Sequence, residues 1–198
     1  EHVRVAYAQS RPLIYNEAGE TKGLFHEVLT AVFEARLCLK LAFTSSPWKR
    51  AQRAVEVGDA DIIVTVATPD RRAYVHVIEP AIYGLNFHVF TSPDHVKRKA
   101  LSSVRSVDDL LRLGVGTATN IGDGWHRSHI AGAGVPTRYL PDITNGFLLV
   151  AGGRVDVVIA TRSTARNVIE HNKLQGQIIE TGGTLPAPSI HILIGKKS

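Results

Sequence analysis

Two adjacent arginines, Arg71 and Arg72, are the residues whose type and position first indicate chemistry. They follow the apolar run IIVTV at residues 62–66 and the turn-forming segment ATPD at residues 67–70. A guanidinium presents a planar fork of N–H donors that binds a carboxylate through two parallel hydrogen bonds. Because open α/β sheets bind ligands beyond the carboxyl ends of their strands, one arginine is either an anion hook or a solvated turn residue.

The composition favours a small-molecule ligand over nucleic acid. The chain has 198 residues, 44% apolar and 21% charged, which suffices for one large domain or two small lobes. Its formal net charge is +5, but the densest basic cluster, at residues 95–99, contains no aromatic residue on which bases would stack. No apolar run approaches the roughly 20 residues that cross a bilayer. We therefore expect no nucleic-acid partner.

Hydrophobic periodicity predicts strands and helices in alternation. In the first half we expect strands at residues 3–8, 39–44 and 61–67, with helices at 23–37 and 46–58 between them. The second of these helices should begin with Ser46 as N-cap and end at Gly58. Because the third strand is apolar on both faces, it should be a central strand of a parallel sheet covered by helices. This order predicts right-handed α/β units.

The second half repeats this alternation. A capping box at Ser106 should start a short helix that ends near Leu113. Strands are then expected at residues 113–119, 137–140, 155–161 and 189–197, and helices at 121–130, 143–153 and 163–172.

One internal echo has two interpretations. The segment GDADIIV at residues 58–64 matches GRVDVVI at residues 153–159 by residue class. Either every helix–glycine–strand unit produces this pattern, or the chain forms two lobes of the same architecture. Extended segments at residues 83–92 and 185–194 could cross between such lobes and act as a hinge.

Six motifs occur in a familiar order: PWKRA, GDAD, TPDR, IEPAIYG, GVGTAT and GRVD. With them the chain resembles the family 3 extracellular solute-binding proteins, which bind polar amino acids and related solutes. The resemblance covers residues 3–197 and implies the two-lobed type II periplasmic-binding-protein fold, an α/β fold with a mainly parallel, helix-flanked sheet in each lobe. Lobe one would comprise residues 1–83 and 187–198, and lobe two residues 84–186, with the solute in the cleft between them.

The resemblance also implies the ligand-binding residues. Arg71 takes the place of the family arginine that grips the solute carboxylate, with Arg72 as its rival. Trp48 would stack on the solute, or else cap the core of its lobe. Thr119 would add a hydroxyl donor beside a helix N-terminus, or else be an ordinary N-cap. The full predicted set is Tyr7, Trp48, Thr65, Ala67, Thr68, Arg71, Thr119, Asn120 and Thr161, with Tyr15 a weaker candidate at the mouth.

One departure from the family pattern concerns the solute's ammonium group. Amino-acid binders usually place a carboxylate near the end of the second-lobe strand, where this chain has Ala160 and Thr161. A desolvated ammonium without a counter-charge is costly. A standard α-amino acid therefore requires Glu27, Asp123 or another acid to substitute, and a carboxylate solute without an ammonium is an alternative. Asp61 and Asp156 begin strands, where we expect turn or capping bonds rather than ligand contacts.

The remaining reactive residue types are expected to be structural. Cys38, the one cysteine, lies between apolar positions and is expected to be buried. His126 and His129 have helical i, i+3 spacing, but no nearby acid or cysteine completes a metal shell, so both are expected on the surface. His76 and His88 should point outward from their strands. No nucleotide-binding or nucleophile motif occurs, so we expect no cofactor, no metal and no enzymatic activity.

The expected function is solute binding outside the cytoplasm, in the periplasm or the extracellular space. One interpretation is the binding protein of an ABC-type uptake system, whose partner is a membrane permease. The other is the extracellular sensing domain of a receptor such as a histidine kinase, whose partner is a transmembrane segment. A free-standing chain with a leader would favour uptake, and a transmembrane segment after Ser198 would favour sensing.

Overall fold

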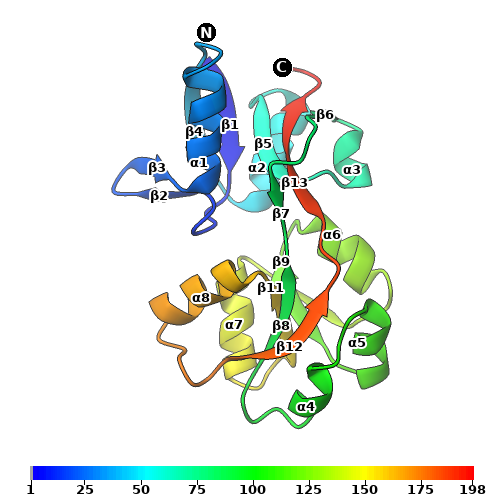
Figure 1. Cartoon of the computed structure of the whole chain (residues 1–198). Coiled ribbons are helices and arrows are strands. Elements are labelled where there is room, and N and C mark those ends of the chain that lie inside the picture. Colours follow the sequence, from blue (N-terminus) through cyan, green and yellow to red (C-terminus); the bar gives the residue numbers. More distant parts are fainter. Residues whose placement is uncertain (1) are drawn as a thin grey trace. The chain divides into compact units, whose positions relative to one another are not determined.

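Residues 2–198 are described by the computed structural model, and they divide into two compact units (Figure 1). Unit 1 comprises residues up to Gly84 together with Ser189–Ser198, and unit 2 comprises Leu85–Pro188. Residue 1, which the sequence assigned to lobe one, lies outside the described residues. Each unit is built on its own sheet with helices packed against it, as the α/β prediction required. Each sheet mixes parallel and antiparallel pairs, whereas mainly parallel pairing was expected.

Unit 1 contains a sheet in the order β4-β1-β5-β13-β6, with β7 paired to β13 and a separate hairpin of β2 and β3. β1 is parallel to β4 and to β5, whereas β13 runs antiparallel to β5, β6 and β7. The strands are β1 (His2–Tyr7), β2 (Tyr15–Glu17), β3 (Glu20–Lys22), β4 (Lys40–Ser45), β5 (Ile62–Val66), β6 (Val75–Val77), β7 (Tyr83–Gly84) and β13 (Ser189–Gly195).

Helices cover both faces of the unit 1 sheet. They are α1 (Leu24–Leu29), which continues as the π-helical segment η1 (Thr30–Glu34), α2 (Trp48–Val57) and the short α3 (Pro69–Arg72). On β5, Ile62 packs in a cluster with Leu29 of α1, and the next residue, Ile63, packs in a cluster with Val55 of α2. Because successive strand residues point to opposite faces, a strand buried on both sides needs a largely apolar run, such as IIVTV in β5.

Unit 2 contains a five-stranded sheet in the order β10-β9-β11-β8-β12. β9 is parallel to β10 and β11, whereas β8 is antiparallel to β11 and β12. The strands are β8 (Phe87–Thr91), β9 (Thr117–Asn120), β10 (Thr137–Leu140), β11 (Val157–Ala160) and β12 (Ile179–Leu185). The helices are α4 (Arg98–Leu101), α5 (Val107–Leu113), α6 (Gly124–His126) with its π-helical continuation η2 (Arg127–Ala131), α7 (Ile143–Ala151) and α8 (Arg162–His171).

The helix ends test the capping predictions. The capping box of α5 is confirmed: the Ser106 hydroxyl accepts the N–H of Asp109, whose carboxylate accepts the N–H of Ser106. The N-cap prediction for Ser46 is wrong, because Pro47 occupies the N-cap position of α2. The backbone N–H of Ser46 instead donates to the Tyr7 carbonyl at 2.9 Å, which keeps Ser46 in the extended segment leaving β4.

The burial prediction for Cys38 is also wrong, because its side chain is exposed. The expected helix over residues 23–37 ends at Glu34 after its last turn widens into η1, so the apolar spacing no longer places this cysteine against the sheet. Cys38 has a positive φ of 56°, and its neighbours Leu37 and Leu39 are exposed with it.

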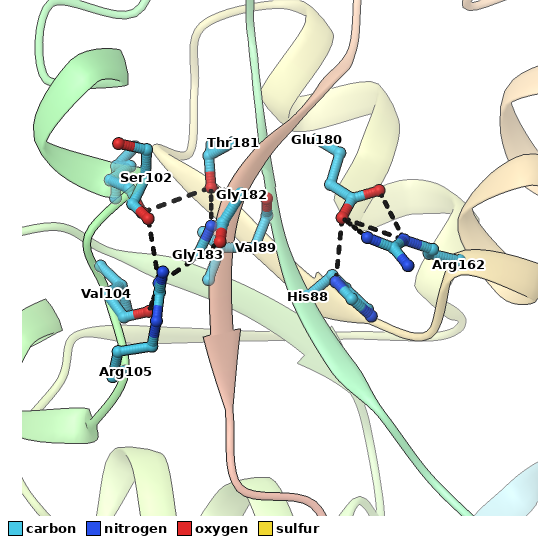
Figure 2. A network of polar contacts seen from close by, with 11 residues as sticks. His88, Val89, Ser102, Val104, Arg105, Arg162, Glu180, Thr181, Gly182 and Gly183 are labelled. Carbon is cyan, nitrogen blue, oxygen red and sulfur yellow. Dashed lines mark hydrogen bonds and ion pairs between the residues drawn. The ribbon is translucent and has the colours of Figure 1, made fainter.

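β12 is a strand that the sequence analysis missed, because two glycines and a bulge interrupt it between Glu180 and Thr184. Figure 2 shows how this irregular segment is held. The Thr181 hydroxyl donates to the Val89 carbonyl at 3.0 Å, and Gly182 has a φ of +88°. A Cβ on Gly183 would lie 2.4 Å from the Leu101 carbonyl oxygen, so only glycine fits there.

The two matching segments, residues 58–64 and 153–159, each contain an aspartate that accepts a backbone N–H from a neighbouring segment. At the start of β5, Asp61 accepts the backbone N–H of Arg4 from neighbouring β1 at 2.7 Å. At the start of β11, Asp156 accepts the backbone N–H of Gly116, just before neighbouring β9, also at 2.7 Å. Hydrogen bonds from the Arg4 side chain lower the pKa of Asp61. Each aspartate therefore ties its strand to the adjacent parallel strand, through a bond between segments distant in sequence rather than the turn or capping bond that was expected.

This tie predicts a loss of stability when Asp156 is replaced. Asp156→Ala leaves the Gly116 N–H without its acceptor, so the free energy of unfolding should fall by roughly 1–3 kcal/mol. Asp156→Asn should lose less, since its amide oxygen still accepts the bond. Urea unfolding measures both, and Asp108→Ala, at an exposed position on α5, is the control. Equal effects of all three substitutions would contradict the assigned role.

Candidate functional site

Arg71 lies beside the carboxyl end of a central strand of unit 1. It is on α3, the short helix that Pro69 begins and that Thr68 caps, immediately beyond the carboxyl end of β5. Its side chain is buried, with 4% of the residue exposed. Nη1 donates to the Val66 carbonyl at 2.8 Å and Nε donates to Oε1 of Gln52 at 3.1 Å. These two bonds fix the plane of the guanidinium inside unit 1.

Trp48 and Gln52 hold Arg71 from α2. The centre of the Arg71 guanidinium lies 5.4 Å from the centroid of the Trp48 ring, within the range of a cation–π contact. Gln52 is one helical turn beyond Trp48, and its amide donates to the Trp48 carbonyl at 3.4 Å. The half-buried Trp48 also packs against the core cluster under α2, so it belongs to the core and to the surroundings of Arg71 at once. The sequence analysis missed Gln52, although its i+4 spacing from Trp48 was a usable signal.

Arg72 lies in a different environment. It is exposed, and its Nε donates to the Ala67 carbonyl at 3.2 Å. Consecutive arginines on a short helix point in different directions, which explains why one is buried and the other reaches solvent. The two therefore form a matched pair for mutagenesis.

The other residues predicted in unit 1 lie at the ends of β1 and β5. Thr65 and Thr68 are buried, at 7% and 6% exposure, and the Thr68 hydroxyl accepts the Arg71 N–H. Ala67 packs against the core cluster under α2. Tyr7 is buried at the end of β1, and its hydroxyl lies 3.2 Å from the Thr21 hydroxyl of the hairpin.

Tyr15 belongs to a separate surface feature of unit 1. It lines an open depression of about 590 Å³ over the β2–β3 hairpin and the start of α1. Lys22, His26 and Glu27 line the same depression, whereas Arg71 and Trp48 do not. The structure thus groups Arg71, Trp48 and Thr68, and it places the weaker candidate Tyr15 with other residues.

In unit 2, Thr119 is the second-last residue of β9, and its hydroxyl meets an aspartate. Its hydroxyl donates to Oδ2 of Asp123 at 2.8 Å, and Oδ1 of Asp123 accepts the N–H of His126 at 3.0 Å. Asp123 is therefore the N-cap of α6, and α6 itself is three residues long. The sequence predicted that free N–H groups at this helix N-terminus could bind an anion. The Asp123 carboxylate already accepts the His126 N–H there, so this expectation does not hold. Asn120, the last residue of β9, is half-buried beside it.

Thr161 has the structural role of an N-cap. Its hydroxyl accepts the N–H of Thr164 at 3.2 Å. Thr161 thereby caps the start of α8, directly after β11. The residue is 8% exposed, so a solute contact through its side chain would compete with the cap. The carboxylate that amino-acid binders usually place here is therefore absent at Ala160 and Thr161, where β11 leads into α8.

An ion cluster that the sequence analysis missed lies near the same end of β11 (Figure 2). Arg162 donates to both carboxylate oxygens of Glu180 at 2.7–3.0 Å. Nδ1 of His88 lies 2.9 Å from Oε1 of Glu180, without the alignment of a hydrogen bond. The hydrogen bonds from Arg162 lower the pKa of Glu180 below its ordinary value of 4.5, while burial opposes them. The outward orientation predicted for His88 is wrong, because the residue is 8% exposed.

The surface prediction for His126 is also wrong. This residue is 2% exposed, and its burial lowers its pKa. His129 is exposed and stacks on Trp125 at 5.2 Å between ring centroids. Within residues 2–198, no group of three or more histidine, cysteine or acidic side chains is arranged to hold a metal ion.

The family follows from a match along the sequence. The model of the bacterial extracellular solute-binding proteins, family 3, matches residues 3–128, which is more than half of the chain. The chain belongs to this family. No curated protein matches the chain. The family is one of binding proteins rather than enzymes, and within residues 2–198 no helix is both long and apolar enough to span a membrane.

Solved structures of similar fold include arginine-binding proteins and a sensor domain. A point mutant of arginine-bound ArgBP from T. maritima has a TM-score of 0.77 and 19% identity, with 100% of this chain and 89% of that chain covered. A histidine kinase sensor domain similar to periplasmic binding proteins has a TM-score of 0.82 and 18% identity, with coverage of 98% and 82%. An ancestral arginine-binding protein bound to glutamine has a TM-score of 0.74 and 19% identity, with coverage of 98% and 84%. The solute-binding protein therefore has the two-lobed periplasmic-binding-protein fold.

The ion pair at Glu180 predicts a pH-dependent contribution to stability. Because its folded-state pKa is lowered, Glu180 stabilises the fold above its ordinary pKa of 4.5, and this contribution is lost as the pH falls further toward the folded-state value. Glu180→Gln should therefore destabilise the protein at pH 7, and its deficit relative to wild type should shrink as the pH falls below 4.5. Thermal unfolding across this range measures it.

The exposed Glu170 on α8 supplies the control for this prediction, as Glu170→Gln should differ little from wild type at either pH. A Glu180→Gln deficit that stays constant from pH 7 to pH 3 would contradict the electrostatic account.

Proposed function

We propose that this family 3 solute-binding protein binds a small polar solute through a carboxylate, and that Arg71 holds that carboxylate. The supporting observation is the fixed guanidinium of Arg71 beyond the carboxyl end of β5, tethered to Val66 and Gln52 beside Trp48. A guanidinium presents its N–H donors in one plane, a shape that matches the two oxygens of a carboxylate. Its plane is set before a solute arrives, so little side-chain entropy is lost on binding.

The proposed solute class is an amino acid or a related carboxylate. Arginine-binding structures of the same fold support this class, although identities near 19% make them a guide to the fold rather than to the ligand. Charge-assisted hydrogen bonds contribute about 1.5–3 kcal/mol each, so a two-pronged contact at Arg71 would supply a substantial part of a micromolar affinity. Thr68 and Trp48 would position the solute around it.

We propose that the biological role is solute capture outside the cytoplasm for an ABC-type uptake system with a membrane permease as partner. A second candidate is the sensing domain of a membrane receptor, and the specific support for it is the sensor domain of similar fold. Deleting the gene separates the two roles. Loss of uptake of the identified solute favours transport, whereas intact uptake with a lost transcriptional response to that solute favours sensing.

Mutating the two arginines separately tests the proposed function. Arg71→Ala should weaken binding of any solute found by thermal shift at least tenfold, because it removes the charge-assisted bonds to the carboxylate. Isothermal titration calorimetry then gives the dissociation constants.

Arg72→Ala is the matched control, because the neighbouring side chain is exposed and donates to a backbone carbonyl. It should leave the affinity within about twofold of wild type. Equal losses from both substitutions, or a larger loss from Arg72→Ala, would show that the carboxylate contact is assigned to the wrong residue.

A further inference from the structure

The inner face of α2 ends in two polar or part-polar side chains beside the core of unit 1. Four residues of this face lie three or four positions apart in the sequence: Trp48, Ala51, Gln52 and Val55. Ala51 and Val55 are fully buried, whereas Trp48 and Gln52 are half-buried. An amide at the margin of a core is expected to have hydrogen-bond partners, and those partners show what the residue contributes.

The orientation of the Gln52 amide follows from two hydrogen bonds. Its Nε2 donates to the Trp48 carbonyl at 3.4 Å, and its Oε1 accepts the Nε–H of Arg71 at 3.1 Å. A backbone carbonyl accepts but cannot donate, so it requires the NH₂ side of the amide. The helix itself therefore turns the amide oxygen toward the arginine.

Arg71 is held both at its backbone and at two nitrogen atoms of its side chain. The Thr68 hydroxyl accepts its backbone N–H at 3.4 Å, and the Val66 carbonyl accepts the bond from Nη1 at 2.8 Å. Bonds at Nε and Nη1 of a rigid planar group fix both its position and its plane. The bond to Gln52 is made by a side chain, so a substitution can change it without changing the course of β5.

The Gln52 amide accepts its bond from Arg71 without carrying a negative charge. A carboxylate in the same place would form a charge-assisted bond, which is about twice as strong as a neutral one. It would then compete with a solute carboxylate for the same guanidinium. The charge of Arg71 acts on the groups around it: burial raises the pKa of the Tyr74 hydroxyl, and the positive charge of Arg71 opposes that rise.

We propose that Gln52 is a positioning residue for the solute carboxylate, because it sets the plane of the Arg71 guanidinium without neutralising its charge. This rests on the proposed function and deepens it, since it gives a role to a side chain that need not touch the solute. A purely structural Gln52 would only join α2 to α3. The two roles differ in one respect: a negative charge on this side chain would strengthen a structural tie to Arg71 but would weaken solute binding.

Gln52→Glu tests this difference on the intact protein. The probes are the twenty L-amino acids, succinate and glutarate, and the tightest binder in a thermal-shift screen is then used in calorimetry. We expect the affinity of Gln52→Glu for that probe to fall at least about tenfold, because the new carboxylate pairs with Arg71. The melting temperature of the solute-free variant should equal or exceed that of wild type.

Gln177→Glu is the matched control for the added charge. The Gln177 amide also donates to the carbonyl four residues earlier, that of Lys173, and the side chain is exposed. This substitution should leave both the affinity and the melting temperature close to the wild-type values.

Gln52→Met removes the acceptor without adding a charge, and nitrogen-15 NMR shows its effect on Arg71 directly. The Arg71 Nε–H signal, identified by its loss in Arg71→Ala, should exchange slowly with water in wild type and in Gln52→Glu. In Gln52→Met it should exchange faster. The affinity should fall at least about threefold, because a guanidinium without this tether loses more side-chain freedom on binding.

The outcomes separate the inference from the proposed function. If Gln52→Glu binds the probe as tightly as wild type while Arg71→Ala does not bind it, the inference is wrong and the proposed carboxylate contact stands. The inference is also wrong if Gln52→Glu loses affinity only together with a lowered melting temperature. If Arg71→Ala binds as tightly as wild type, or no probe binds, the proposed function fails and the inference fails with it.

Discussion

The burial of the Arg71 guanidinium is the physical constraint on which the candidate site depends. Removing a charge from water is costly unless hydrogen bonds and nearby electron density replace the solvent. For Arg71 the replacements include the Val66 carbonyl, Gln52 and the Trp48 ring, all within unit 1. Two elements supply them, because β5 ends at Val66 and α2 carries Gln52 and Trp48 on adjacent turns. The strand end and the helix must therefore be correctly placed before the arginine can be.

In both units, an aspartate at the start of a central strand binds the backbone of the neighbouring strand or of the residue just before it. Asp61 and Asp156 each bind a backbone N–H at or just before the neighbouring strand, which fixes where β5 and β11 begin and hence where they end. Both central strands are almost wholly apolar, since Thr65 is the one polar residue of β5 and β11 has none. The polar residues of unit 2 gather accordingly at the carboxyl ends of β9 and β11. The polarity at the two ends differs: β5 leads to a cation, and β9 leads to a carboxylate.

Much of the fold could be predicted from the sequence because the signals were local. The apolar run of β5, the stop at Gly58 and the capping box at Ser106 each depend on a few adjacent residues. The wrong or missing predictions concern segments whose structure depends on tertiary packing. Cys38 is exposed because η1 shortens the helix, and β12 was missed because its bulge is stabilised by Thr181 and by backbone segments distant in sequence.

In the candidate site, too, local sequence signals predicted some residues, whereas the positions of others depend on tertiary packing. Arg71 and Trp48 were predicted from motifs and lie together, although their contact with a solute stays a prediction. His126 and His88 were wrongly expected to face solvent, because spacing alone does not show which side chains the rest of the fold covers. Asp123 was noted only as a substitute acid. Its bonds to Thr119 and His126 became visible only in three dimensions.

A crystal structure of the protein with its bound solute tests the central claim most directly. The account predicts that two nitrogen atoms of Arg71 lie about 2.7–3.0 Å from the two oxygens of the solute carboxylate. It also predicts that the bonds from Arg71 to Val66 and Gln52 persist and hold the fork in place. A bound solute whose carboxylate lies on other residues, with Arg71 contacting only protein atoms, would contradict the account.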